Sequence, residues 1–327
     1  MSAVIPVEHG SPRRTTRTGR LIKLGDPVRS RPSDPTVHQL RAALDIRLRA
    51  VLAHDPGTRL GADPEELHQM RVAVRRMRAT LKAARPLLDR IWVDDLYAEL
   101  GWLGRALGPV RDADVLLDRL RGRAAAFDDT SRAAVESLIE ALVADRATAR
   151  AEMLAVLGSR RYTALLRRLA NAVSRPLPSA RGRVAARSLV ELVRTEFGKL
   201  AKAVQTAGEN PSDEVLHALR IRGKRLRYTG ELAASSGRKR VRRLMRTLVE
   251  STVALQDVLG EHQDACVAQH QVMLLLDGLG DGVDVEVAFA AGRLVEREEV
   301  SRMATRRSWS AAWQQVQHQA QSLQPTT

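Results

Sequence analysis

Aromatic side chains are scarce in this sequence of 327 residues, where Phe, Trp and Tyr together make up 3%. The strands of β-sheets are normally enriched in aromatic and β-branched residues. Alanine, leucine, valine and arginine dominate instead, and this balance suits packed helices. The composition therefore argues against a sheet protein and predicts an all-α fold.

Cysteine and long apolar segments are equally rare. Cys266 is the single cysteine, which excludes an internal disulfide framework and suits a reducing compartment. No apolar run approaches the roughly 20 residues of a membrane span, and residues 1–10 lack the apolar stretch of a signal peptide. With 44% hydrophobic residues, the chain can still bury a core. We predict a globular, cytoplasmic protein without a membrane partner.

Positive charge is what the sequence has in excess, with 53 lysines and arginines against 38 acidic residues and a net charge of +15. This balance predicts a partner rich in negative charge, such as nucleic acid, an anionic membrane or another polyanion. An arginine-rich composition alone would scatter the arginines, whereas here they line up on particular predicted helices. We therefore favour a functional basic surface.

The chain divides into a tail and two series of predicted helices. Residues 1–35 lack helical periodicity and predict a basic, disordered tail. From residue 36 to about 320, apolar residues recur at helical spacing between short breaks, and short connections favour antiparallel neighbours. The first helical repeat, 36–172, contains predicted helices at 36–54, 63–88, 91–108, 111–126, 129–157 and 160–172. The second, 181–320, contains them at 181–206, 212–235, 238–259, 262–276 and 283–319.

Two motifs recur in the same order in both series. "LHQMRVAVRRMR" at 67–78 matches "LHALRIRGKRLR" at 216–227, and "LGPVRDADV" at 107–115 matches "LGEHQDACV" at 259–267. The offsets are 149 and 152 residues, a period that indicates a duplicated domain and not a solenoid of short repeats. Asp63 and Ser212 each stand five residues before the motif histidine and are predicted N-caps, with Pro64 in the first helical turn.

The first of these motifs places cations along one helical face. Steps of three and four residues put them on a common stripe beside the apolar seam that packs into the bundle. Like charges at this spacing repel unless acidic neighbours or an anionic ligand neutralise them. Arginine suits phosphate because its planar guanidinium donates two hydrogen bonds to one phosphate and stays charged. The stripe consists of His68, Arg71, Arg75, Arg78 and Lys82 in the first copy, and of His217, Arg220, Lys224 and Arg227 in the second.

No pattern in the sequence predicts catalysis or metal binding. There is no HExxH, no nucleophile elbow and no glycine-rich phosphate loop. A site crowded with arginine repels a divalent cation, so His68 and His217 are expected to bond a ligand or cap a helix. Asp112 and Asp264 are expected to orient basic side chains from within the protein. We predict that the protein is not an enzyme and has no catalytic residues, metal or cofactor.

These motifs resemble those of the CHAD family, the conserved histidine α-helical domain. The resemblance extends over about residues 36 to 320 and rests on "LHQMRVAVRRMRATLK", "LGPVRDADV", "LHALRIRGKRLRY" and "LQDVLGEHQDACV". It implies two helical bundles related by pseudo-two-fold symmetry, with basic helices lining a surface that binds inorganic polyphosphate. It also implies a place on polyphosphate granules in the cytoplasm.

The resemblance transfers a set of polyphosphate contacts by matching position. Ala73 stands where the second copy has Arg222, so the two halves need not contribute equally. The candidate polyphosphate-binding residues are His68, Arg71, Arg75, Arg76, Arg78, Lys82, His217, Arg220, Arg222, Lys224, Arg225 and Arg227.

A nucleic-acid-binding protein is the main alternative. The basic tail and the net charge would suit it, and weak, non-specific binding of nucleic acid is expected in any case. The folded part, however, offers few aromatic residues for base stacking and no groove-reading motif. Polyphosphate needs neither, because it is a chain of charges with no base to read. The sequence leaves the preferred chain length, the oligomeric state and the biological role open.

Overall fold

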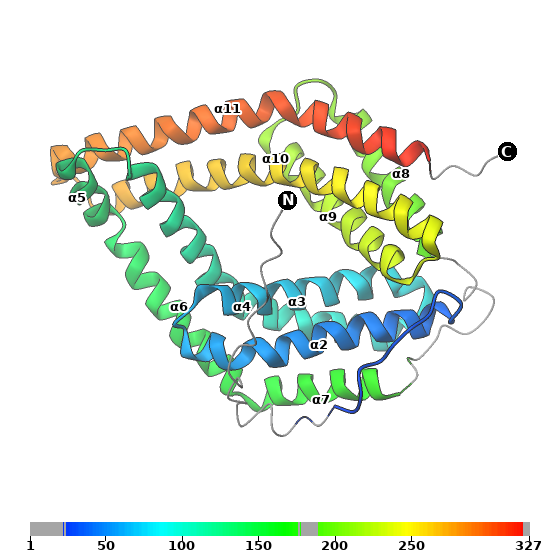
Figure 1. Cartoon of the computed structure of the whole chain (residues 1–327). Helices are drawn as coiled ribbons and strands as arrows, with labels where there is room; N and C mark the ends of the chain where they lie inside the picture. The colour runs from blue at the N-terminus through cyan, green and yellow to red at the C-terminus, as the bar shows by residue number, and fades with distance from the viewer. Residues whose placement is uncertain (1–21, 23, 176, 178–188, 323–327) are drawn as a thin grey trace, which may run out of the picture.

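The structure is a computed structural model of the chain and describes residues 22, 24–175, 177 and 189–322. Within these ranges the secondary structure is helical and contains no strand, so the all-α prediction is confirmed (Figure 1). The helices of the first series are α2 (Thr36–Leu60), α3 (Pro64–Ala84), the 3-10 turn η1 (Arg85–Leu87), α4 (Arg90–Ala124), α5 (Asp129–Leu138), α6 (Glu140–Gly158) and α7 (Arg160–Ser174). Those of the second are α8 (Leu189–Ala207), α9 (Asp213–Ser236), α10 (Lys239–Gly278) and α11 (Val285–Gln321).

The two basic motifs open α3 and α9, and both helix starts agree with the prediction. The Asp63 carboxylate accepts a hydrogen bond from the Glu65 backbone N–H at 2.8 Å, with Pro64 following in the first turn. The Ser212 hydroxyl accepts one from the Val215 N–H at 3.4 Å. Each cap satisfies a backbone donor that a helix start leaves free. The duplication itself stays a prediction.

Several predicted breaks between helices are wrong. α4 runs through Pro109, where we expected separate helices at 91–108 and 111–126, and α10 runs through 260–261, where we expected a second break. Proline removes one backbone donor, but the buried Leu107 and Val110 on either side hold α4 to the core. In one place the structure has a break that we did not predict: the predicted helix 129–157 divides into α5 and α6 at the fully buried Ile139.

The apolar interior consists of two cores, and neither follows the division into two series. The larger core joins residues of α2, α3, α7, α8, α9 and the end of α6 to the first half of α4, the first half of α10 and the end of α11. The smaller core joins the second half of α4 and α5 to the end of α10 and the start of α11. The helices of each series therefore pack partly on the other series.

Residues 24–35 are a correction to the predicted disordered tail. They carry no helix, as expected, but they lie against α2. The Val28 backbone N–H donates to the buried Asp45 carboxylate at 2.9 Å, and Arg49 donates to the Gly25 carbonyl at 2.6 Å. Residue 22 is buried in the larger core. The rest of the predicted tail lies outside the described residues.

None of the helices in the described ranges combines the length and the apolar character needed to cross a membrane.

Candidate functional site

A cavity of about 460 Å³ lies where α3 and α9 face each other, with α4 and α10 completing its walls. Figure 1 shows α9 and α3 on either side of the middle of the molecule. We call this the central cavity. Its polar lining residues are His68, Arg71, Arg75, Arg111, Asp112, Arg119, His217, Arg220, Lys224, Gln263 and Asp264.

Half of the twelve predicted site residues meet in the central cavity. They come from the first turns of the two basic helices, and each helix contributes one histidine and two cations at equivalent places. Segments about 150 positions apart in the sequence thus form one basic surface. The six are His68, Arg71 and Arg75 from α3, and His217, Arg220 and Lys224 from α9.

One carboxylate stands beside the first arginine of each helix. Arg71 donates to Asp112 of α4 at 3.1 Å, and Arg220 lies 4.0 Å from Asp264 of α10. These contacts agree with the predicted orienting role of Asp112 and Asp264. The neighbouring Asp114 instead turns into the protein, where it is 7% exposed and accepts from Arg146 of α6.

Each "LG" motif places a glycine beside one of these arginines: Gly108 of α4 lies beside Arg71 of α3, and Gly260 of α10 lies beside Arg220 of α9. A Cβ at Gly108 would lie 2.9 Å from the guanidinium of Arg71, so glycine leaves the room that this arginine occupies. At Gly260 the nearest atom of Arg220 would be 3.8 Å away, which is an ordinary contact distance. The arginine therefore packs more tightly against the glycine in the first copy of the motif than in the second.

The two histidines have different neighbours at matching positions. Burial and the nearby Arg111 lower the pKa of His68, which favours the neutral ring. The ring of His217 is hydrogen-bonded through Nδ1 to Gln263, which occupies the position of Arg111 in the second motif. Imidazole can therefore offer a hydrogen bond to an anion in this cavity while the arginines supply the charge.

The cations of the two helices influence each other across the cavity. Burial, followed by Arg220 and Arg75, lowers the pKa of Lys224 to about 8. Burial raises the pKa of Asp264, and the nearby Arg220 offsets part of that rise. The cavity thus holds more positive charge than its own carboxylates neutralise, an arrangement suited to binding an anion with several charges.

The other six predicted residues lie outside the central cavity. Arg76 and Arg227 form ion pairs with Glu231, at 3.4 Å and 2.9 Å respectively. The Arg78 guanidinium lies 4.5 Å from the centre of the Tyr97 ring. Lys82 and Arg225 line a second cavity further along α3 and α9, and Arg222 lines neither cavity.

Arg111 and Arg119 of α4 are cavity residues that the sequence reading missed. Both lie on the α4 face that also presents Asp112, and the motif match at 107–115 contains Arg111. Arg119 donates to Glu261 of α10 at 2.9 Å and to Glu298 of α11 at 2.9 Å. Arg123, one turn later, also donates to Glu298, at 3.0 Å. These contacts, here called the interhelical clamp, fix the wall of the cavity to both later helices.

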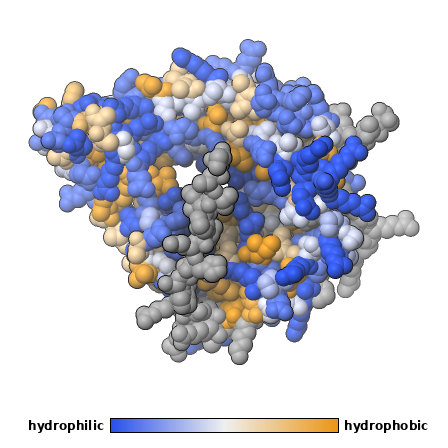
Figure 2. All heavy atoms as spheres, in the orientation of Figure 1, coloured by the Kyte–Doolittle hydropathy of each residue, from blue (hydrophilic) through white to orange (hydrophobic). Residues whose placement is uncertain are grey.

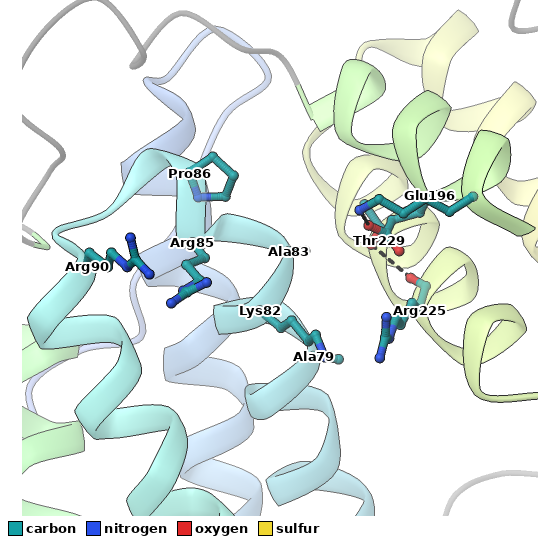
Figure 3. A pocket seen from close by; sticks show the side chains of 10 residues that line it. Ala79, Lys82, Ala83, Arg85, Pro86, Arg90, Glu196, Arg225 and Thr229 are labelled. Atoms are coloured by element: carbon teal, nitrogen blue, oxygen red, sulfur yellow. Dashed lines mark hydrogen bonds and ion pairs between the residues drawn. The ribbon is translucent and has the colours of Figure 1, made fainter. Parts of the chain in front are cut away.

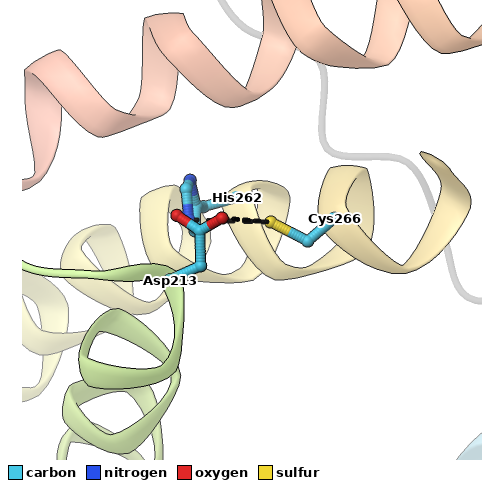
Figure 4. A group of neighbouring side chains, drawn as sticks. All are labelled: Asp213, His262 and Cys266. Atoms are coloured by element: carbon cyan, nitrogen blue, oxygen red, sulfur yellow. Dashed lines mark hydrogen bonds and ion pairs between the residues drawn. The ribbon is translucent and has the colours of Figure 1, made fainter. Parts of the chain in front are cut away.

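Within the described ranges, one group of side chains brings three metal-ligand atoms within 4.8 Å of one another (Figure 4). It consists of Asp213 at the start of α9 with His262 and Cys266 of α10. The Asp213 carboxylate already accepts hydrogen bonds from Arg302 at 2.8 Å and from Arg306 at 2.5 Å. Burial raises the pKa of Cys266 to about 11, which keeps the thiol protonated. The group is thus a hydrogen-bonded junction between α9, α10 and α11.

A protein-family profile and two proteins of known sequence match this chain. The profile of the CHAD domain matches residues 42–272. Two uncharacterized proteins of Mycobacterium tuberculosis, from strains CDC 1551 and H37Rv, are 32% identical over 276 residues. The match includes 82% of this chain and 50% of each relative, so the chain spans about half their length.

Two solved structures are similar in fold. PptA from Streptomyces chartreusis superposes with a TM-score of 0.68 at 23% identity, over 86% of this chain and 100% of that one. The CHAD domain of the plant Ricinus communis superposes with a TM-score of 0.62 at 25% identity, over 89% and 95% of the two chains.

Proposed function

The chain belongs to the CHAD domain family, and on that premise we propose that it binds inorganic polyphosphate in the central cavity without transforming it. The observation that supports this most directly is the meeting of the two basic motifs: six side chains from α3 and α9 line one cavity. Such a surface suits a ligand that repeats its charge at every unit, because several guanidinium groups can each bind a phosphate.

The composition of the cavity favours polyphosphate over nucleic acid. Among the described residues that line the central cavity, the only rings are the imidazoles of His68 and His217. No Tyr, Phe or Trp lines it on which a base could stack. Binding would rest on charge-assisted hydrogen bonds and on the release of counterions. A protein of this kind would collect on polyphosphate granules in the cytoplasm.

The test removes charge from one helix at a time. One variant carries Arg71→Gln and Arg75→Gln on α3, and the other carries Arg220→Gln and Lys224→Gln on α9. Each lost charged hydrogen bond is worth about 1.5 kcal/mol, so each double variant should bind long-chain polyphosphate about a hundredfold more weakly. Titration of labelled polyphosphate followed by fluorescence anisotropy measures this, and circular dichroism checks that the variants keep their helices.

The matched control removes two charges from outside the cavity. Arg240 and Arg243 are exposed residues of α10 that line neither cavity, and the Arg240→Gln, Arg243→Gln variant should keep nearly all its polyphosphate affinity. Equal losses in all three variants would mean that net charge, and not the cavity, binds the ligand.

A nucleic-acid ligand is favoured by one observation of its own. The start of α10 presents six exposed cations without an intervening acid, namely Arg238, Lys239, Arg240, Arg242, Arg243 and Arg246. Figure 2 shows that hydrophilic residues also dominate much of the face seen in Figure 1. If the Arg240→Gln, Arg243→Gln variant loses affinity for single-stranded DNA but keeps its affinity for polyphosphate, the nucleic acid binds at the start of α10 and not in the central cavity.

A further inference from the structure

The first half of α11 exposes apolar side chains along the side that faces away from the smaller core. Val285 is 79% exposed, Phe289 60% and Val300 61%. Steps of three and four residues place them on one line along the helix. Figure 1 shows α11 along the upper edge of the molecule, where a partner can reach this line. We call it the outer face of α11, and it consists of Val285, Phe289, Gly292, Glu296, Val300 and Met303.

An open cavity of about 520 Å³ lies in the middle of the outer face. Every described residue that lines it belongs to α11, namely Ala288, Phe289, Gly292, Arg293, Glu296 and Arg297. A Cβ added at Gly292 would have no heavy atom within 4 Å, so the space above the helix backbone is open there. A side chain from a partner helix can therefore pack beside Phe289 against this part of α11.

The charge of this segment indicates which kind of partner fits. Residues 285–304 contain four acids and three bases, so they are nearly neutral in a chain whose net charge is +15. The second cavity differs, because Lys82 and Arg225 reach into it from opposite walls (Figure 3). A polyanion is thus attracted elsewhere on the molecule, and the outer face suits an apolar helix with both signs of charge.

The carboxylate at the centre of the outer face is free to pair with such a helix. Glu296 is exposed and has no cationic partner among the described residues. Arg293 pairs with Asp128 at 3.2 Å, and Arg297 donates to the Arg123 carbonyl at 2.6 Å. Each guanidinium has five N–H donors, so Arg293 and Arg297 can accept a further carboxylate from a partner.

The sequence of the outer face is complementary to itself when two copies of α11 lie antiparallel. A two-fold axis beside Leu294 and Val295 sets residues at equal distances from it opposite each other. Phe289 then meets Val300 of the second copy, and Arg293 meets Glu296 of the second copy. Symmetry repeats both contacts. A parallel pair would instead set Glu296 against Glu296, where like charges repel.

We propose that the outer face of α11 is a homodimer interface in which two copies of the chain pair antiparallel. Apolar contacts form at both ends of the interface and ion pairs form at its centre. The two-fold contact is closed, so association stops at two copies. One helix pair buries less area than a standard interface, and this predicts a weak dimer with a micromolar dissociation constant. The proposal goes beyond polyphosphate binding and does not depend on it.

Sedimentation velocity of the full chain, without any polyanion, tests the proposal. A salt concentration of about 0.15 M shortens the Debye length to about 8 Å and screens the repulsion between two basic chains. Between about 1 and 100 µM, the parent should pass from the mass of one chain, 36.1 kDa, towards twice that mass. The Phe289→Ala, Val300→Ala variant should dimerise at least about tenfold more weakly, because apolar contact is lost at both ends.

Two charge reversals test the antiparallel register. Glu296→Arg and Arg293→Glu each place like charges opposite each other, so each variant alone should dimerise at least about tenfold more weakly than the parent. In an equal mixture, opposite charges meet again at both positions, and dimers should return. Circular dichroism checks that both variants keep their helices, because Arg293 also pairs with Asp128.

The matched control is Glu152→Arg, which makes the same charge reversal at an exposed residue of α6 and should dimerise like the parent. A parent that stays monomeric over the whole concentration range would refute the homodimer and leave the outer face to a different partner. Dimers that the Phe289→Ala, Val300→Ala variant forms as tightly as the parent would place the interface elsewhere. A mixture that associates no better than its two components would refute the antiparallel register.

Discussion

Gly108 and Gly260 occupy matching places in the two motifs, but the space beside them differs. A Cβ added at Gly108 would come within 2.9 Å of the Arg71 guanidinium, whereas one at Gly260 would lie 3.8 Å from Arg220. The Arg71 guanidinium would therefore have to shift from its position beside Asp112, which weakens its contacts there. The loss of about 1 kcal/mol of charged hydrogen bonding predicts that Gly108→Ala binds polyphosphate about fivefold more weakly, measured by titration.

The matched variant is Gly260→Ala, for which binding should stay at the parent level. Alanine is the better helix former by about 1 kcal/mol, and the side chain that must shift at Gly108 is flexible. Both variants should consequently be at least as stable as the parent in thermal unfolding. A Gly108→Ala protein that binds as tightly as Gly260→Ala would show that the position of Arg71 does not matter for binding.

Lys224 makes binding dependent on pH. Its pKa of about 8 results from burial and from the neighbouring arginines, so the free protein loses this charge as pH rises through 8. A bound polyanion favours the charged form and raises the pKa again. We expect proton uptake on binding near pH 8 and weaker binding above it, measured by isothermal titration in two buffers of different ionisation enthalpy.

The Lys224→Gln variant is the control for this prediction. It should bind more weakly at neutral pH and should lack the proton uptake near pH 8. Uptake that persists in the variant would assign the titration to another group. Burial lowers the pKa of His68 from its ordinary value of about 6.5, so this ring is already neutral in the free protein at pH 8.

The helical spacing of the cations predicted correctly that residues near the starts of the two basic helices share one face. His68, Arg71 and Arg75, with their matches on α9, meet in the central cavity. The same stripe also contains Arg78 and Arg227, which lie outside the central cavity. Arg78 contacts the ring of Tyr97, and Arg227 forms an ion pair with Glu231. Their partners lie on other parts of the chain, and a sequence does not show which acid or ring will stand opposite a given arginine.

At the scale of elements, the helix starts were more predictable than the breaks. Caps such as Asp63 and Ser212 act within one turn, so the local sequence determines them. The continuity of α4 through Pro109 depends on burial against distant helices, which outweighs the missing backbone donor. The second half of α4 matters for the site, because it brings Arg111 and Arg119 to the central cavity.

The interhelical clamp connects the two series across the whole molecule. The Glu298 side chain of α11 is fully buried and accepts hydrogen bonds from Arg119 and Arg123 of α4. Removing Glu298 leaves Arg119 and Arg123 to share the single carboxylate of Glu261, so part of their charge loses its compensation. We expect Glu298→Ala to lower the free energy of unfolding by about 3 kcal/mol, measured in urea.

Glu296→Ala is the comparison for the clamp. This glutamate lies on the exposed side of α11, two residues earlier, and its removal should change stability by less than about 0.5 kcal/mol. Similar unfolding midpoints for Glu298→Ala and the parent would mean that the clamp adds nothing to stability.

Both cores need residues of α11, the last helix of the described chain, and this has a consequence for synthesis on the ribosome. The larger core contains Leu40 near the start of α2 together with Trp313 and Val316 near the end of α11. The smaller one needs the start of α11 to cover α4 and α5. A nascent chain can therefore complete the smaller core only after the start of α11 has left the exit tunnel, and the larger core only after nearly all of α11 has left it. Until then the apolar faces of the earlier helices stay uncovered, which is the interval in which a chaperone would act.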